Sequence, residues 1–359
     1  MKVLVLATDY PNNQGGVTLM YIHTRNKYYA KKGITVKVLN FSAISNYEYE
    51  DIPVITLKEF ENSSEKFDVL IVHAANLRNH YRFLKKYGDR FPRFIFFFHG
   101  HEVLKVRETY STPYSYVKNR GIKNSFVQDL YDDYKLAVWR KYYDKIQHKS
   151  QYIFVSGWMR DKFEKYVKLD TKQFRTYIIP NNIGSVFEEQ AYDSLLPKEF
   201  DFVTIRSNLD GSKYCVDVIN RLAKYNKDLR FLLVGQGEYF NHYEKAENIT
   251  WIQNSLPQHK IPSVLNRARC ALMPTRLDAQ GVMMCEMASF GIPLITSNID
   301  ICREISGILN NVITIDNEKT VDLKPYLEQI KEYYSKEKNT YFYADSTVGK
   351  EVEIIEGRL

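Results

Sequence analysis

The 359-residue chain is predicted to be an α/β protein of two domains, each built on a mostly parallel sheet. Short, uninterrupted apolar runs such as Val3–Thr8 alternate with longer stretches that can form helices, as expected for strands buried on both faces and their crossover helices. The length suits two domains of ordinary size. The alternation pauses at a polar stretch, Glu188–Glu199, and restarts at Phe202, so we place the linker there.

The composition is that of a soluble globular protein, with 44% apolar and 26% charged residues. No stretch is long and apolar enough to span a membrane. The apolar run at the start is too short for a signal peptide and is followed too early by an acidic residue, Asp9. The four cysteines lie in the second half without metal-ligand spacing. We therefore expect buried thiols, no disulfide framework and a cytoplasmic location.

Charge is distributed unevenly along the chain. Residues 1–200 carry 31 Lys and Arg against 22 Asp and Glu, whereas the remainder carries 19 against 21. A basic first half suggests an anionic partner or a membrane surface for that half. A basic surface that is merely solvated explains the same numbers equally well.

The first domain begins with a βαβ unit. Strand Val3–Thr8 is followed by the loop Asp9–Gly16, the helical stretch Val17–Lys32 and the strand Thr35–Asn40. The right-handed crossover of such a unit puts the loop at the carboxyl edge of the sheet, where ligands bind. The dinucleotide fingerprint GxGxxG is absent, so the glycine pair ending at Gly16 is only weak evidence for a phosphate site.

Two more buried strands, Phe67–Ala74 and Arg93–Glu102, follow, and the second ends in His99-Gly-His101. A histidine at the carboxyl end of a strand stands where α/β sites are built. Metal chelation by both histidines is disfavoured because alternate strand residues point to opposite faces. A structural histidine is the usual alternative to a ligand-binding one.

Basic and aromatic residues are interleaved in residues 79–87 and 103–125. They could form a lip for a lipid-linked pyrophosphate acceptor at a membrane face, or stack against sugar rings. An irregular loop with surface tyrosines is an equal alternative. No nucleic-acid-binding module is recognisable, so a nucleic-acid partner is not predicted. Further elements expected in this domain are the helix Phe126–His148, which leads to the segment Tyr152–Ser156, and the helix Gly157–Val167, which is followed by the segment Thr176–Ile183.

The second domain opens with the strand Phe202–Arg206 and a loop that leads to Lys213 and a helix. Arg206 and Lys213 thus stand at a strand end and a helix start. Two fixed cations could stabilise the charge that develops on a diphosphate leaving group without a metal ion. A basic pair in a loop is, however, more often only solvated.

Three strands follow, Leu229–Gly237, Ile249–Ile252 and Cys270–Met273, and then a short helix that opens at Gly281. Asp278 precedes this helix and Glu286 lies inside it. The unpaired N–H groups of a helix start suit a phosphate or sugar oxygen, and Gly281 has no Cβ to obstruct a ligand. Carboxylates beside such a helix start can accept hydrogen bonds from sugar hydroxyls. Two ordinary surface acids remain the alternative explanation.

The order of these motifs resembles the retaining glycosyltransferases of family 4, which have the GT-B fold. The resemblance covers nearly the whole chain and includes the Gly-Gly loop ending at Gly16, the His-Gly at 99–100, Ile-Pro-Asn at 179–181, Val-Gly-x-Gly at 234–237, and an acid, seven residues and a glutamate from Asp278 to Glu286. Asp278 stands where Glu is usual. The resemblance implies two Rossmann-like, doubly wound domains facing across a cleft.

The domains implied by this resemblance are an acceptor-binding domain of residues 1–190, a nucleotide-sugar-binding domain of residues 200–338, and a C-terminal helix in residues 339–359 that returns to the first domain. The implied activity is transfer of a sugar from a nucleotide-diphosphate sugar to a hydroxyl of a saccharide acceptor. That acceptor would be lipid-linked or a cell-envelope polysaccharide, with peripheral membrane contact through the basic first domain. No cofactor and no metal ion are implied beyond the donor substrate.

The resemblance also implies residue roles. At the reaction centre, His99 and Asp278 would contact the sugar, and Arg206 with Lys213 would hold the pyrophosphate. The remaining donor and loop contacts would come from Gly16, Gly235, Gly237, Asn254, Ser255, Leu256, Gly281 and Val282, with Glu286 on the ribose hydroxyls.

Two other functions fit the same residues. A GT-B nucleotide-sugar 2-epimerase would isomerise the donor without any acceptor. A non-enzymatic sugar-binding protein of polysaccharide assembly would bind polysaccharide but no nucleotide diphosphate.

Overall fold

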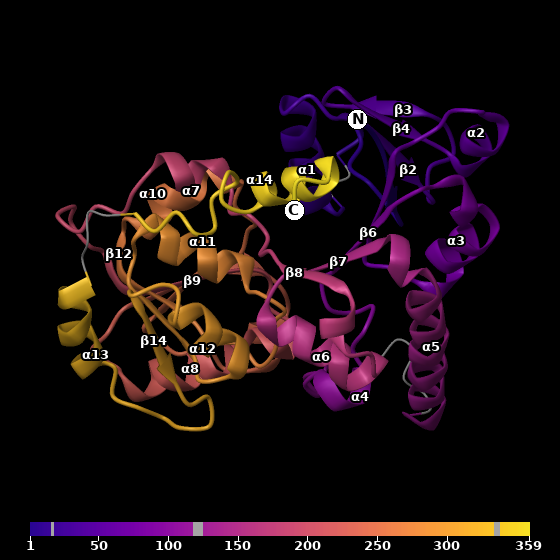
Figure 1. Cartoon of the computed structure of the whole chain (residues 1–359). Coiled ribbons are helices and arrows are strands. Elements are labelled where there is room, and N and C mark those ends of the chain that lie inside the picture. The colour runs from indigo at the N-terminus through magenta and orange to yellow at the C-terminus, as the bar shows by residue number, and fades with distance from the viewer. Residues whose placement is uncertain (16–17, 118–124, 334–337) are drawn as a thin grey trace. The chain divides into compact units, whose positions relative to one another are not determined.

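The computed structural model describes all residues except 16–17, 118–124 and 334–337. The chain forms two compact units, each containing more than one segment of sequence (Figure 1). The first unit comprises Met1–Val106, Phe126–Asn181 and Ala344–Leu359, and the second comprises Arg107–Ser125 and Asn182–Tyr343. Among the described helices, none combines the length and apolar content that crossing a membrane requires.

The first unit is built on a sheet with the strand order β3-β4-β2-β1-β5-β6-β7-β8. Every neighbouring pair is parallel except β3 with β4. All residues of β5 and β6 are buried, as their continuous apolar sequences require in a sheet covered on both faces. The strands are β1 (Lys2–Ala7), β2 (Thr35–Asn40), β3 (Tyr47–Tyr49), β4 (Ile52–Ile55), β5 (Val69–His73), β6 (Phe94–Phe98), β7 (Ser150–Phe154) and β8 (Arg175–Ile178).

Helices connect these strands and confirm the doubly wound pattern expected from the sequence. The α-helices are α1 (Met20–Lys31), α2 (Leu57–Asn62), α3 (Arg82–Tyr87), α4 (Val106–Thr109), α5 (Ser125–Ile146), α6 (Gly157–Val167) and α14 (Val348–Glu356). Short 3₁₀ or π turns are η1 (Leu77–Tyr81), η2 (Gly88–Arg90), η3 (Gln147–Lys149) and η4 (Thr171–Gln173).

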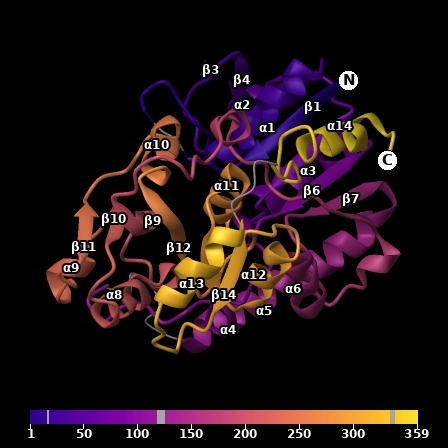
Figure 2. The ribbon, with the colours of Figure 1, turned by 90° about the vertical axis from the view of Figure 1, so that its left-hand side faces the viewer.

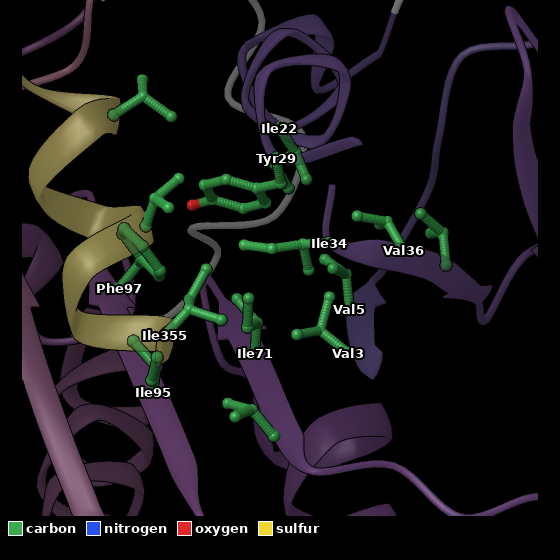
Figure 3. Packing of buried hydrophobic residues seen from close by; sticks show 14 of the residues in the cluster. Val3, Val5, Ile22, Tyr29, Ile34, Val36, Ile71, Ile95, Phe97 and Ile355 are labelled. Carbon is green, nitrogen blue, oxygen red and sulfur yellow. The ribbon is translucent and has the colours of Figure 1, made fainter. Parts of the chain in front are cut away.

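The C-terminal helix α14 belongs to the first unit, which confirms the predicted return of the chain. Its residues Val348, Val352, Ile354 and Ile355 join the core formed by strand β1, helix α1 and neighbouring elements (Figure 3). Within this core Glu351 of α14 and Arg25 of α1 form a fully buried ion pair, with Nε and Oε1 3.1 Å apart. The hydroxyl of Tyr29 also donates to Glu351, so this carboxylate is satisfied on both oxygens.

The second unit is built on an entirely parallel sheet with the order β11-β10-β9-β12-β13-β14, part of which is seen in Figure 2. Its strands are β9 (Phe200–Asn208), β10 (Phe231–Gln236), β11 (Ile249–Ile252), β12 (Ala268–Met273), β13 (Leu294–Ser297) and β14 (Val312–Ile315). Its helices are α7 (Ser185–Glu189), α8 (Val216–Tyr225), α9 (Tyr239–His242), α10 (Ile261–Leu265), α11 (Val282–Phe290), α12 (Asp300–Ser306) and α13 (Lys324–Gln329), with the turns η5 (Ser212–Tyr214), η6 (Gln258–Lys260) and η7 (Ile330–Tyr333). All four cysteines lie in this unit and are buried free thiols.

The segment expected to be a linker, Glu188–Glu199, is packed onto the second unit instead. Tyr192 donates its backbone N–H to the carbonyl of Phe290 at 2.7 Å, and Phe187 packs edge-on against the same Phe290 ring. These contacts of aromatic residues within and beside the polar stretch hold it on the second unit despite its charge. The boundary between the two units in sequence lies at Asn181.

Residues 107–125 also differ from expectation, because they group with the second unit although they interrupt the first in sequence. The hydroxyls of Tyr114 and Tyr116 donate to Asp217 and Asp210 of the second unit, at 2.8 and 2.7 Å. The sequence alone pairs none of these residues with another.

Candidate functional site

The second unit contains a pocket of about 270 Å³ where strands β9, β10 and β12 end. Parallel α/β sheets bind ligands at this carboxyl edge. The pocket wall includes seven residues singled out from the sequence, namely Arg206, Asn254, Ser255, Leu256, Asp278, Gly281 and Val282. It also includes residues that sequence reasoning did not select, among them Ser207, Tyr214, Thr275, Met283 and Met284.

Helix α11 begins at the pocket. Gly281 is its N-cap, with φ at 73°, a left-handed conformation that favours glycine. No side chain caps this helix start, and the first amides of a helix have no partner within it. Because Val282, Met283 and Met284 line the pocket, this first turn can offer N–H groups and partial positive charge to a ligand oxygen.

Asp278 lies in the pocket wall just before that helix. Its Oδ1 accepts hydrogen bonds from the backbone N–H groups of Ala279 and Gln280, at 2.8 and 3.3 Å. These bonds fix the carboxylate on the turn that leads into Gly281. A hydrogen-bond acceptor that a sugar hydroxyl could use therefore lies beside the helix start.

Arg206 and Lys213 are brought together by the ring of Tyr214. The guanidinium carbon of Arg206 lies 5.1 Å from the ring centroid, and Nζ of Lys213 lies 4.7 Å from it. Arg206 lines the pocket and donates from Nη2 to the carbonyl of Pro274 at 2.7 Å. Lys213, on turn η5, is not among the residues that line the pocket.

The guanidinium of Arg206 is held in a partly desolvated position. Burial lowers the pKa of Arg206, and the charge of Asp278 acts in the opposite direction. Its Nε is buried and has no hydrogen-bond partner among the described residues. A bound anion would offset the cost of desolvating this cation.

Gly235 and Gly237 do not line the pocket; they pack against the end of β9 and the loop that follows it. A Cβ on Gly235 would lie 2.2 Å from the carbonyl oxygen of Arg206, and one on Gly237 would lie 2.9 Å from Cβ of Leu209. The glycines therefore allow the end of β10 to approach this loop closely. Their effect on the pocket is indirect, through the backbone of Arg206.

Glu286 lies on the second turn of α11 and is almost fully buried, but it is not among the pocket-lining residues. Its Oε1 accepts hydrogen bonds from the N–H of Gly184 at 3.2 Å and from Nε2 of Gln258 at 2.7 Å. Burial raises its pKa to about 7, while these two hydrogen bonds act in the opposite direction. The carboxyl group is therefore partly protonated near neutral pH.

His99 lies in the first unit, directly after strand β6. Its Nε2 is 3.1 Å from Nδ1 of His73, and its ring lies 4.7 Å from that of Tyr21. Burial, together with the charge of Arg25, lowers the pKa of His99 well below its usual value, so the imidazole is neutral. The predicted Gly16 falls outside the described residues.

Two residues beside the predicted site carried signals that sequence reasoning did not use. His73 ends β5 and pairs in register with Phe97 of β6, so it occupies the strand-end position that singled out His99. Tyr214 directly follows Lys213, where an aromatic ring can hold a cation. Within the described residues, no cluster of three or more His, Cys, Asp and Glu side chains could hold a metal ion.

Residues 202–332, which make up most of the second unit, match the family model described as glycosyl transferases group 1. This match makes the second unit similar to the group 1 glycosyltransferases over those residues. No curated protein sequence matches the chain.

Solved structures with this fold cover both units of the chain. The sucrose-phosphate synthase of Thermosynechococcus elongatus aligns with 100% of this chain and 94% of its own, at 12% identity and a TM-score of 0.63. A trehalose-6-phosphate structure from E. coli bound with UDP-2-fluoro glucose aligns with 100% of this chain and 96% of its own, at 10% identity and a TM-score of 0.55. WaaG, a glycosyltransferase involved in lipopolysaccharide biosynthesis, aligns over 99% of this chain and 100% of its own, at 15% identity and a TM-score of 0.57. These similarities confirm the predicted GT-B fold.

Proposed function

We propose that this protein is a retaining glycosyltransferase that moves a sugar from a nucleotide-diphosphate sugar to a hydroxyl of a saccharide acceptor. The observation that carries the proposal is the pocket of the second unit, which Arg206, Asp278 and the start of helix α11 all line, in a segment that matches the group 1 glycosyltransferase model. A cation, a hydrogen-bond acceptor and a set of unpaired amides are the groups that a sugar diphosphate needs.

The donor would extend along the carboxyl edge of the sheet. The base would lie near Asn254, Ser255 and Leu256, and the sugar near Asp278 and the start of α11. The pyrophosphate would lie near Arg206, with Lys213 adding charge once its side chain turns from the ring of Tyr214. Glu286 would act on the ribose after exchanging a hydrogen bond from Gln258 for one from a hydroxyl. The E. coli relative bound with UDP-2-fluoro glucose supports a nucleotide-sugar donor.

In the proposed reaction the bond from the anomeric carbon to the diphosphate oxygen breaks, and the acceptor oxygen bonds to the same face of that carbon. The departing phosphate oxygen takes the acceptor's proton. Arg206 and Lys213 would stabilise the negative charge that develops on the diphosphate, so positioning and electrostatics supply most of the rate. On this mechanism no metal ion is needed, and chelator leaves activity unchanged.

The proposed acceptor is a lipid-linked saccharide or a cell-envelope polysaccharide, reached from the inner face of the membrane. Two observations support it: the excess of basic residues in the first half of the chain, and the similarity to a glycosyltransferase of lipopolysaccharide biosynthesis. His99, neutral and partly buried at the end of β6, is the proposed sugar-contacting residue of the first unit.

Titration calorimetry of the whole protein with UDP, GDP and dTDP tests the proposal first. One of these nucleotides should bind, with the other two weaker; binding of none of them, together with binding of a polysaccharide, would favour an assembly protein. The sugar donor of the preferred base is then incubated with and without acceptor. Isomerisation of the donor in the absence of acceptor would instead identify an epimerase.

A further inference from the structure

Residues Tyr110–Val117, here called the strap, cross onto the second unit. In sequence they lie between Val106 and Phe126, which both belong to the first unit, yet they are part of the second. Ser111 and Tyr116 of the strap bond to the loop between β9 and α8, which carries Lys213 and Tyr214, and Tyr114 bonds to Asp217 in the first turn of α8.

Tyr114 forms the first anchor. Its hydroxyl donates to Oδ1 of Asp217 at 2.8 Å, and its ring packs against Tyr239 with centroids 5.0 Å apart. Asp217 also accepts from both terminal nitrogens of Arg276, at 2.9 and 2.6 Å. Burial alone would raise the pKa of Asp217, but the hydrogen bonds from Arg276 and Tyr114 outweigh it and lower the pKa. The strap thus completes the shell around an ionised carboxylate.

The Asp217–Arg276 pair in turn holds the backbone of turn η5. Nη1 of Arg276 donates to the carbonyl of Ser212 at 2.8 Å, and its backbone N–H donates to the carbonyl of Lys213 at 2.9 Å. Ser111 of the strap contacts the same turn directly, with its Oγ 2.9 Å from Oγ of Ser212. The strap therefore shares with Arg276 the hydrogen bonds that hold the turn of Lys213 and Tyr214.

Tyr116 forms the second anchor at the other end of the loop. Its hydroxyl donates to Oδ1 of Asp210 at 2.7 Å, and this oxygen also accepts from the N–H of Glu238 at 2.8 Å. The Tyr116 ring stacks on His242 with centroids 4.1 Å apart. The strap consequently fixes the loop at both Asp210 and Ser212, on either side of its glycine.

From this arrangement we infer that Tyr114 and Tyr116 are positioning residues for the diphosphate of the donor. Neither ring is among the residues that line the pocket; they act through Asp217, Arg276 and Asp210 to hold the loop that presents Lys213 and Tyr214 beside Arg206. The inference rests on the proposed function, because it assumes a diphosphate at that place. It assigns the strap to the phosphate end of the donor and leaves the base end, near Asn254, independent of it.

The test is calorimetry of the Tyr114→Phe/Tyr116→Phe variant with the diphosphate of the preferred base and with the matching monophosphate. Both rings stay, so packing is kept and only the two hydroxyls are lost. Hydrogen bonds to charged groups are stronger than those between neutral groups, so the loss of both hydroxyls should loosen the loop that carries Lys213. The Kd for the diphosphate should therefore rise about tenfold or more, whereas the Kd for the monophosphate should change by less than about twofold. In turnover, KM for the donor should rise more than kcat falls.

Tyr192→Phe is the matched control. It removes a hydroxyl of the same unit that donates to the carbonyl of Ala268 on strand β12 at 2.8 Å, so the ratio of the two affinities should not change. If the strap variant binds both nucleotides as tightly as the wild type, or binds both more weakly by the same factor, the inference is overturned and the proposed function still stands. If wild-type protein binds no nucleotide diphosphate, the proposed function itself fails.

Discussion

Replacing Glu286 by glutamine is expected to remove a pH dependence from the stability of the second unit. Burial raises the pKa of this carboxyl group from an ordinary value of 4.5 to about 7. The folded protein therefore holds the proton more tightly than the unfolded chain does. The resulting stabilisation is fully present below pH 4.5 and is lost as the pH rises through 7. Glutamine keeps the oxygen that accepts from Gly184 and Gln258 but does not titrate.

The size of the effect follows from the two pKa values. Each pKa unit between the folded and unfolded states corresponds to about 1.4 kcal/mol, which gives about 3 kcal/mol over the full range. Part of this is already lost at pH 5, so between pH 5 and pH 8 the wild-type protein should lose about 2.5 kcal/mol relative to the glutamine variant.

The assay is urea denaturation between pH 5 and pH 8, with pulsed hydrogen exchange on peptides from β12 to β13 to follow the second unit alone. Glu247→Gln, at an exposed position of the same unit, serves as the control and should change stability by less than about 0.5 kcal/mol throughout. If wild type and Glu286→Gln differ by the same amount at every pH, the carboxyl group is not held protonated by burial and the reasoning is refuted.

Other predictions concern activity and the first unit. Lys213→Ala should lower kcat/KM by about 100-fold or more, because charge stabilisation at the leaving group is lost, and Glu286→Ala should do the same because a donor contact is lost. The far-UV circular dichroism of both variants should stay that of the wild type. Wild-type-like turnover in either variant would contradict these roles. Dialysis against chelator should leave transfer activity intact, and a loss that a divalent ion restores would disprove the proposed mechanism. Glu351→Ala should destabilise the first unit by about 3–5 kcal/mol in denaturant titrations, because it leaves Arg25 buried without its carboxylate. Glu356→Ala, which removes the partner of Arg358 on the exposed side of the same helix, should cost less than about 1 kcal/mol, and an equal loss in both variants would exclude the buried pair as the cause.

The sheets could be predicted because parallel strands buried on both faces need continuous apolar sequence. Runs such as those of β1, β6 and β12 have few alternatives in a chain of this composition. The start of α11 could be predicted because it depends on residues close in sequence: Gly281 has a positive φ, and the carboxylate of Asp278 accepts from the next residue's N–H. Short elements such as β3 and β14 were not predicted, since three or four residues give too little pattern.

What could not be predicted depends on which way side chains turn in the folded protein. Glu286 follows the start of α11 by one turn, and its carboxylate faces Gly184 and Gln258, which are distant in sequence. Lys213 lies over Tyr214 instead of in the pocket wall. Tyr114 is about a hundred residues from Asp217, and no local pattern pairs them. Such long-range polar contacts are specified by the tertiary fold.

The place of helix α14 has a consequence for how the protein is made. The main segment of the second unit, Asn182–Tyr343, is inserted in sequence between the body of the first unit and the helix that completes its core. During synthesis the ribosome therefore delivers Arg25 more than three hundred residues before Glu351, its buried partner. Until α14 has been synthesised, the first unit lacks four apolar residues of its core and the carboxylate that pairs with Arg25.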